Sequence, residues 1–256
     1  MELVATPPGR MVRLGRATLD LILPPRCLGC GVEVQGAGSL CPACWAGLRF
    51  LTPPWCRICG YPLPHAVPEA PLCPLCAAEP QVYDRARAAV RYDEGSRRLI
   101  LAFKRGARFE GLRSFGRWLA AAGTDLLGDV DAILPVPMHR WRLVGRGYNQ
   151  AGLLAQALAR ESGRPWLPDS LRRMRATASQ QGLSAGARLE NITAAAFAVP
   201  AGHVGRIEGA KLLLVDDVLT TGATVTACAK VLRRHGAERV DVLTLARVVR
   251  DGGNPI

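Results

Sequence analysis

The segment from Lys211 to Thr224 reads KLLLVDDVLTTGAT, and it decides the fold that the sequence predicts. Its first part, Leu212 to Val215, is an apolar run typical of a strand buried inside a sheet. Two adjacent carboxylates, Asp216 and Asp217, follow at the carboxyl end of this strand. The small residues of the Thr220–Thr224 loop then lead into a helix. The segment therefore predicts a strand, a loop and a helix of an α/β sheet.

The chemistry of this segment points to a phosphorylated ribose. In open α/β sheets, ligands bind at the carboxyl edge of the strands, where this loop is expected to lie. The hydroxyl groups and backbone amides of the Thr220–Thr224 loop, together with the helix dipole, suit a phosphate. Asp216 and Asp217 would repel an anion unless they accept hydrogen bonds, and a ribose diol supplies such donors. An acid–base pair of carboxylates is disfavoured, because neighbouring strand residues point to opposite faces.

Strand and helix patterns alternate over the chain from residue 81 onward. The expected strands are 87–92, 132–136, 194–199, 212–215 and 239–246, and the expected helices are 96–105, 112–127, 148–161 and 223–235. This alternation implies a mostly parallel sheet flanked by helices. Cys228 lies on the last of these helices and is interpreted as a small buried residue.

The first 80 residues contain four Cys-x-x-Cys pairs. Glycine follows the first and third pairs, and proline lies inside the second and fourth, so one unit occurs twice. Two such pairs complete a tetrahedral zinc site whose four thiolates leave no open position, which makes the zinc structural. The sequence therefore predicts a double zinc ribbon, with two zinc ions held by Cys27, Cys30, Cys41, Cys44, Cys56, Cys59, Cys73 and Cys76.

Disulfides and iron–sulfur clusters are the alternatives for these cysteines. Disulfides need an oxidising compartment, and no export signal is visible in the sequence. Iron–sulfur clusters also use four cysteines. The repeat favours pairing the first pair with the second and the third with the fourth, while cross-bracing stays open. Many prolines and few bulky apolar residues predict that bound metal supplies the missing stability of this segment.

Composition and charge describe a globular protein with a basic surface. Hydrophobic residues make up 49% of the 256 residues and charged residues 21%, which excludes a disordered chain or a coiled coil. No apolar stretch approaches the roughly 18 residues of a membrane span, and we expect a cytoplasmic protein. The net charge is +12, and nearly all of it comes from residues 81–256. Such a surface attracts polyanions, including nucleic acid, phosphorylated metabolites and anionic lipid.

Four motifs together resemble the ComF family, in which a zinc-ribbon region precedes a type I phosphoribosyltransferase domain. VDDVLTTGAT resembles the phosphoribosyl pyrophosphate (PRPP) motif of these enzymes. The other motifs are LPVPMHR at 134–140, RGYNQ at 146–150, and Gln180 with Leu183, Arg188 and Asn191. The resemblance covers Cys27 to about Arg247, and we expect a double zinc ribbon at 25–80 and a phosphoribosyltransferase domain at 81–256. We also expect a helical segment at 1–24, which adds nothing to the resemblance.

The resemblance also implies roles for individual residues. Asp216 and Asp217 would contact the ribose hydroxyls of PRPP, and Mg²⁺ would bridge its oxygens. The 5′-phosphate would be held by Thr220, Thr221, Gly222, Ala223 and Thr224, and the pyrophosphate loop would contain Pro137, Met138, His139 and Arg140. The catalytic candidates are Lys104, Arg175 and Arg188. The last two lie, with Arg172 and Arg173, in the segment 172–191, which corresponds to the mobile hood of this fold. Tyr148 is interpreted as stacking on a base or, preferably, as packing under the sheet edge.

Two functions stay open. The first is a PRPP-binding protein of natural transformation, which handles incoming single-stranded DNA beside a helicase or other competence proteins, without inserting into the membrane. The second is a phosphoribosyltransferase of nucleotide or amine metabolism, with an unidentified acceptor and no role in DNA. PRPP binding and turnover need different residues, so the sequence leaves catalysis open.

Overall fold

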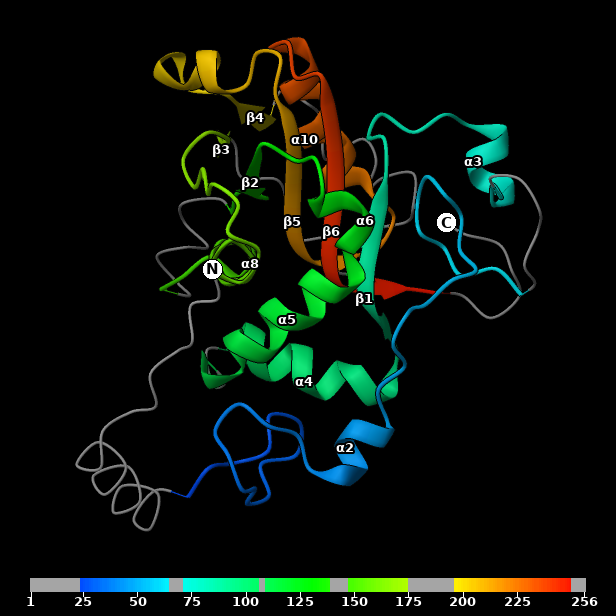
Figure 1. The fold of residues 1–256 in the computed structure, drawn as a ribbon, viewed down its shortest axis with the longest axis vertical. Coiled ribbons are helices and arrows are strands. Elements are labelled where there is room, and N and C mark those ends of the chain that lie inside the picture. The colour runs from blue at the N-terminus through cyan, green and yellow to red at the C-terminus, as the bar shows by residue number, and fades with distance from the viewer. Residues whose placement is uncertain (1–23, 65–70, 106–108, 139–146, 175–195, 250–256) are drawn as a thin grey trace, which may run out of the picture.

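A four-stranded parallel sheet forms the centre of the molecule (Figure 1). The computed structural model describes residues 24–64, 71–105, 109–138, 147–174 and 196–249. The strand order is β1-β6-β5-β2, and each neighbouring pair is parallel. The strands are β1 (Ala86–Tyr92), β6 (Arg239–Val248), β5 (Lys211–Leu219) and β2 (Ala132–Pro135). A separate antiparallel pair consists of β3 (Arg172–Arg173) and β4 (Phe197–Ala198).

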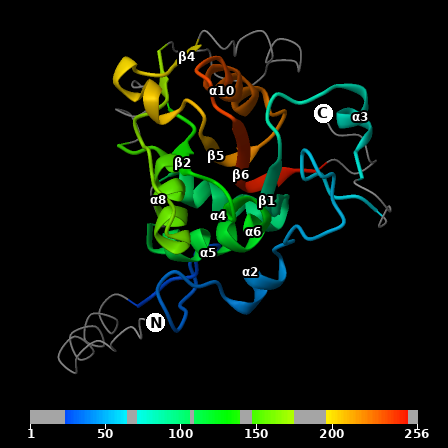
Figure 2. The ribbon, with the colours of Figure 1, turned by 45° about the horizontal axis from the view of Figure 1, so that its top comes forward.

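Helices cover both faces of the sheet, as the view in Figure 2 shows. One face is covered by α4 (Glu94–Lys104), α5 (Leu112–Ala122), α6 (Thr124–Leu127) and α8 (Gln150–Ser162). The other face is covered by α10 (Ala223–Arg234). These layers explain why β5 reads as a continuous apolar run, since both of its faces are buried.

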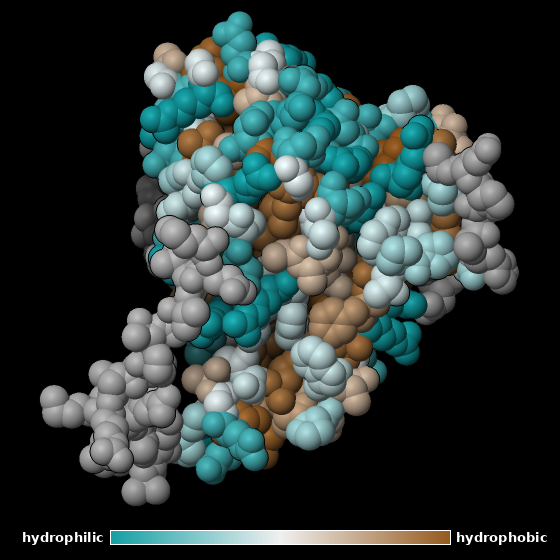
Figure 3. Space-filling model, viewed as in Figure 1, coloured by the Kyte–Doolittle hydropathy of each residue, from teal (hydrophilic) through white to brown (hydrophobic). Residues whose placement is uncertain are grey.

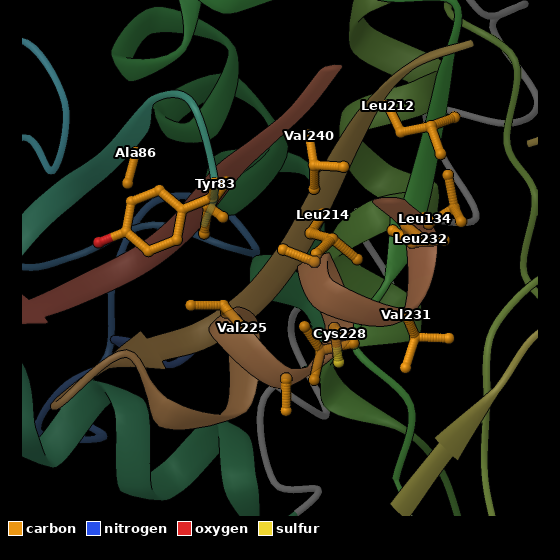
Figure 4. Close-up of a cluster of buried hydrophobic side chains, with 14 of the residues drawn as sticks. Tyr83, Ala86, Leu134, Leu212, Leu214, Val225, Cys228, Val231, Leu232 and Val240 are labelled. Carbon is orange, nitrogen blue, oxygen red and sulfur yellow. The ribbon is translucent and has the colours of Figure 1, made fainter. Parts of the chain in front are cut away.

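The side chains of β5 alternate between two hydrophobic clusters. Leu212 and Leu214 pack with α10 residues such as Val225 and Cys228 (Figure 4). The intervening Leu213 and Val215 pack on the opposite face with α4, α5 and α8. The burial of Cys228, with none of its surface exposed, confirms its interpretation as a core residue.

The two cysteine-rich units pack on different parts of the sheet domain. The first, which contains α2 (Pro42–Ala46), contributes Leu28 and Leu48 to the cluster under α4 and α5. The second, which contains α3 (Pro74–Ala78), contributes its cysteines and Tyr61 to the cluster of α10. The chain between them runs along β1, where the amide of Leu51 donates to the carbonyl of Ala89 over 3.0 Å. This segment covers the edge strand of the sheet.

An aromatic cluster joins the first unit to α5. The rings of Trp45 and Phe50 lie 5.3 Å apart, and Trp118 contacts both at 6.0 and 5.4 Å. Trp45 and Phe50 are among the exposed large apolar side chains. Apolar residues are visible on this face, in the region between α5 and α2 (Figure 3).

The predicted elements are found with several changes of boundary. The predicted strand 212–215 is longer, because pairing with β6 continues through Asp216 and Asp217 to Leu219. The predicted helix 112–127 is divided at Gly123 into α5 and α6, and the predicted helix 148–161 begins at Gln150. The N-terminal segment 1–24, except its last residue, lies outside the described residues.

Candidate functional site

The carboxylate pair lies near the carboxyl end of β5. Asp216 is paired with Thr244 of β6 in the sheet register, and both carboxylates are half-buried. The backbone amide of Asp217 donates to Oδ1 of Asp216 over 2.8 Å, which orients the Asp216 side chain. The sheet thereby holds two neighbouring acids at the edge where α/β proteins bind ligands.

The surroundings of Asp216 favour the neutral, protonated form of its carboxyl group over the charged carboxylate. Burial raises the pKa of Asp216 to about 8, and the negative charge of Asp217 contributes to the same shift. The hydrogen bond from the backbone of Asp217 and the charges of Lys104 and Arg173 act in the opposite direction. Asp216 is therefore mostly protonated at neutral pH, unless a cation or hydrogen-bond donors stabilise the carboxylate.

Lys104 supplies a positive charge to this pair. It is the last residue of α4, and its Nζ lies 3.0 Å from Oδ2 of Asp217. The two side chains are 29% and 17% exposed, so solvent screens this ion pair less than one on an open surface. The structure thus places one catalytic candidate beside the acids that the sequence assigned to ribose.

The proposed phosphate loop connects β5 to α10. Gly222 has a φ of +79°, a left-handed conformation that favours glycine, and it immediately precedes α10. The amide of Ala223 lies 3.4 Å from Oγ1 of Thr221. Ala223 and Thr224 occupy the first turn of α10, where backbone amides lack carbonyl partners within the helix. The loop therefore has the general form of a helix N-terminus that binds an anion.

The beginning of the proposed pyrophosphate loop lies next to β5. The amide of Val136 donates to the carbonyl of Val215 over 2.8 Å, and Pro137 and Met138 follow as buried and half-buried residues. His139, Arg140, Arg175 and Arg188 lie outside the described residues. Of the hood arginines, Arg172 and Arg173 form β3, and the guanidinium of Arg173 lies 5.4 Å from the ring centroid of Phe197.

Residues of the RGYNQ segment approach the site through backbone contacts. The hydroxyl of Tyr148 donates to the carbonyl of Phe103 over 2.9 Å, and its ring contacts Phe109 with centroids 4.8 Å apart. The amide groups of Asn149 and Gln150 donate to the carbonyls of Val136 and Lys104. Neither interpretation of Tyr148 from sequence included this role; the polar character of three consecutive residues was the available signal.

Eight cysteines form two clusters of four, in the order that the repeat favours. Cys27, Cys30, Cys41 and Cys44 form one, and Cys56, Cys59, Cys73 and Cys76 form the other; within each cluster all sulfurs lie within 4.8 Å of one another. The sulfurs of Cys30 and Cys41 are 3.7 Å apart and those of Cys59 and Cys73 are 3.6 Å apart. A zinc tetrahedron with bonds of about 2.3 Å separates its sulfurs by about 3.8 Å. Both clusters therefore fit structural zinc.

The thiols of each cluster differ in acidity. Burial opposes ionisation of Cys27, but backbone hydrogen bonds from Cys30, Cys41 and Gly29 lower its pKa to about 6. Burial raises the pKa of Cys44 to about 12, and hydrogen bonding within the cluster adds to the shift. Crowded sulfurs do not all ionise on their own, so a divalent cation is needed to collect four thiolates.

Arg247 connects the second cluster to the edge of the sheet. It is paired with Leu219 in the register of β5 and β6, and only 6% of its surface is exposed. One guanidinium nitrogen donates to the carbonyl of Cys59, another lies 3.6 Å from the Cys59 sulfur, and Arg247 also stacks on Tyr61. One pocket is lined by Cys59, Arg247 and the turn from Thr220 to Gly222. Sequence reasoning missed this link, although a charged residue inside an apolar strand was a visible signal.

Comparison with known proteins identifies the family. The chain is 34% identical over 228 residues to "Competence protein F" of Haemophilus influenzae, covering 87% of this chain and 96% of that protein. It is 32% identical to "DNA utilization protein YhgH" of Escherichia coli K12, covering 90% of this chain and all of the relative. The chain belongs to the ComF family.

Two domain profiles agree with this ComF assignment. Residues 18–77 match the double zinc ribbon domain, and residues 147–255 match the phosphoribosyl transferase domain. The fold is thus the predicted type I phosphoribosyltransferase fold with an N-terminal zinc-ribbon module. Among solved structures, a glutamine PRPP amidotransferase of B. subtilis is 18% identical, with a TM-score of 0.39 over 57% of this chain and 30% of that one. This similarity is too low to add to the assignment.

We predict that the two zinc centres of this ComF protein differ in their effect on stability. Wild-type protein should contain two zinc ions per chain by elemental analysis, and Cys30→Ser and Cys59→Ser should each lose one. Cys59 is buried against Arg247, whereas Cys30 is exposed. Compared with Cys30→Ser, Cys59→Ser should therefore lower the free energy of unfolding by about 2 kcal/mol more. The corresponding extra loss in Tm is about 4–8 °C. Equal Tm losses, or wild-type protein without zinc, would contradict this prediction.

Proposed function

We propose that this ComF protein binds PRPP together with Mg²⁺ at the carboxyl edge of β5. The proposal rests on one observation: two half-buried acids, a lysine and the N-terminus of α10 lie together at the carboxyl edge of the sheet. The turn before α10 suits the 5′-phosphate, and Asp216 and Asp217 suit the ribose hydroxyls. Mg²⁺ coordinates phosphate oxygens and water in preference to an all-protein cage, so it would arrive with PRPP.

Within this proposal, Lys104 and Arg173 supply positive charge beside the carboxylate pair. Lys104 neutralises Asp217 in the protein alone and stands close enough to contribute to binding an anionic ligand. Arg173 lies near enough to Asp216 to influence its pKa. The arginine excess of residues 81–256 gives the domain a positive net charge, which attracts both PRPP and nucleic acid because both are anionic.

We further propose that PRPP binding serves the handling of single-stranded DNA in natural transformation. The names of the relatives, "Competence protein F" and "DNA utilization protein", support this role. The basic domain supports it on electrostatic grounds, because single-stranded DNA binds along positively charged surfaces. A helicase or another competence protein is the proposed protein partner, and the cytoplasm is the proposed location. The described helices include none that is both long and apolar enough to cross a membrane.

Transfer of the ribosyl group is the alternative function. In such a reaction the bond between the anomeric carbon and pyrophosphate breaks, and pyrophosphate leaves with the electron pair. A lone pair of the acceptor forms the new bond, and the acceptor loses a proton. Of the histidines in the described residues, His235 lies at the far end of α10 and His203 bonds to Ser170. The positions of Lys104 beside Asp217 and of Arg173 near Asp216 suit pyrophosphate departure, and the acceptor remains to be found.

Calorimetric titration of zinc-loaded protein with PRPP and Mg²⁺ tests the proposed site. We expect wild-type protein to bind PRPP, and we expect Asp216→Ala/Asp217→Ala to weaken binding by more than about tenfold, because two acceptors of hydrogen bonds are lost. The matched control is Asp129→Ala/Asp131→Ala, which removes two aspartates preceding β2 and should leave PRPP affinity unchanged. Folded wild-type protein that gives no binding heat would overturn the proposal.

The same titration with single-stranded DNA already bound tests the link between the ligands. We expect DNA to change the PRPP affinity and to bind less tightly as salt concentration rises. Unchanged PRPP affinity would separate the two ligands, and DNA binding that does not respond to salt would count against the proposed DNA role. Release of pyrophosphate with a nucleobase or amine, without DNA, would favour the alternative function.

The raised pKa of Asp216 predicts a pH dependence of PRPP binding. At pH 7 its carboxyl is mostly protonated, since the pKa is about 8, whereas accepting hydrogen bonds from ribose favours the carboxylate. PRPP binding should therefore release a proton, and affinity should rise up to about tenfold between pH 7 and 9. Asp216→Asn removes this titration and should give a flat profile. A wild-type profile that matches that of Asp216→Asn would contradict the assignment.

A further inference from the structure

We propose that Tyr148, Asn149 and Gln150 form a positioning clamp, which holds Lys104 against the carboxylate pair and fixes the start of the pyrophosphate loop. Each of the three side chains donates to a backbone carbonyl. Tyr148 binds Phe103 over 2.9 Å, Gln150 binds Lys104 over 3.2 Å, and Asn149 binds Val136 over 3.3 Å. The role assigned to Lys104 in binding rests on the proposed PRPP function, whereas the clamp itself rests on these contacts.

The clamp acts at the carboxyl end of α4. The last four carbonyls of any helix lack partners within that helix and need other donors. Here the backbone amide of Arg105 turns back to Leu101 and Ala102, while the carbonyls of the final two residues, Phe103 and Lys104, accept from Tyr148 and Gln150. The clamp therefore determines where α4 ends, and with it the position of the Lys104 backbone.

The clamp itself stands on a rigid base. Gln150 is the first residue of α8, a 13-residue helix that packs against β5 and β2. Only 2% of the surface of Gln150 is exposed, so leaving its side-chain amide without hydrogen-bond partners would destabilise the fold. The ring of Tyr148 packs edge-on against Phe109 at an interplanar angle of 78°. The donors are thus held in place before any ligand binds.

A fixed backbone matters for a long, flexible side chain. The lysine side chain is a flexible stem of four carbons, and its ammonium can reach many positions unless the backbone that carries it is fixed. With the clamp in place, Nζ lies 3.0 Å from Asp217. Through the hydrogen bond from Asn149, the same three-residue segment also fixes the position of Val136, the residue before Pro137. One segment thus sets the distance between the cation of α4 and the loop after β2.

The clamp residues are positioning residues, because they contact backbone groups and act through Lys104. Two variants remove one donor each, Tyr148→Phe and Gln150→Leu. Gln156→Leu is the matched control, since Gln156 is a half-buried glutamine on the same helix. Tyr148→Phe loses a single oxygen and should fold even if Gln150→Leu does not.

The first readout uses protein without ligand. The chain has only three lysines, Lys104, Lys211 and Lys230, so lysine-selective ¹³C labelling gives three side-chain signals in NMR spectra. Lys104→Met identifies the signal of Lys104. We expect this signal to shift toward that of a free lysine in Tyr148→Phe and Gln150→Leu, with Lys211 and Lys230 unchanged and no shift in Gln156→Leu. An unchanged Lys104 signal in both clamp variants would overturn the clamp.

The second readout is PRPP affinity in a double-mutant cycle. Lys104→Met should weaken binding about tenfold and each clamp variant about three- to tenfold, as expected for one charge-assisted contact. In the Lys104→Met background the clamp variants should cause no further loss, because they act through Lys104. Additive losses would show a merely structural role and overturn the positioning claim. If wild-type protein binds no PRPP, the proposed function fails, and the lysine spectra still decide whether the clamp exists.

Discussion

The ion pair between Lys104 and Asp217 is the interaction on which the candidate site depends. Two adjacent carboxylates at the end of a buried strand repel each other and any incoming anion, and burial raises the cost of their charge. The protein offsets this cost with one proton on Asp216, as its raised pKa indicates, and with one ammonium group on Asp217. In the proposed function, this compensation lowers the repulsion that an anionic sugar phosphate meets at this edge. The end of α4 is as much a part of the site as β5.

The cysteine-rich units belong to the packing of the domain and are more than appendages. The first completes the hydrophobic cluster under α4 and α5 with Leu28 and Leu48. The second completes the cluster on the α10 face, and Arg247 joins its Cys59 to the strand end beside the proposed phosphate loop. Structural zinc thereby stabilises both faces of the sheet that carries the site. This arrangement gives a physical reason for the two modules to occur in one chain.

Local signals in the sequence were sufficient for most of the fold. The spacing of cysteines fixes a tetrahedral ligand set within a short chain segment, and the apolar run of β5 followed by a small-residue loop has few other readings. Contacts between distant segments were not predictable in this way. The pairing of Lys104 with Asp217 and of Arg247 with Cys59 depends on how α4, β6 and the second unit meet in space. The hydrogen bond from the Tyr148 hydroxyl to the end of α4 was not predictable either, because neither stacking on a base nor packing under the sheet edge includes a partner from a distant helix.

A crystal structure of the zinc-loaded protein with Mg²⁺ and PRPP would test the central claim most directly. We expect the 5′-phosphate on the backbone amides between Thr220 and Thr224, the ribose hydroxyls on Asp216 and Asp217, and the Lys104 ammonium within reach of the ligand. PRPP bound away from the end of β5, or bound there with its phosphate far from the N-terminus of α10, would contradict the claim.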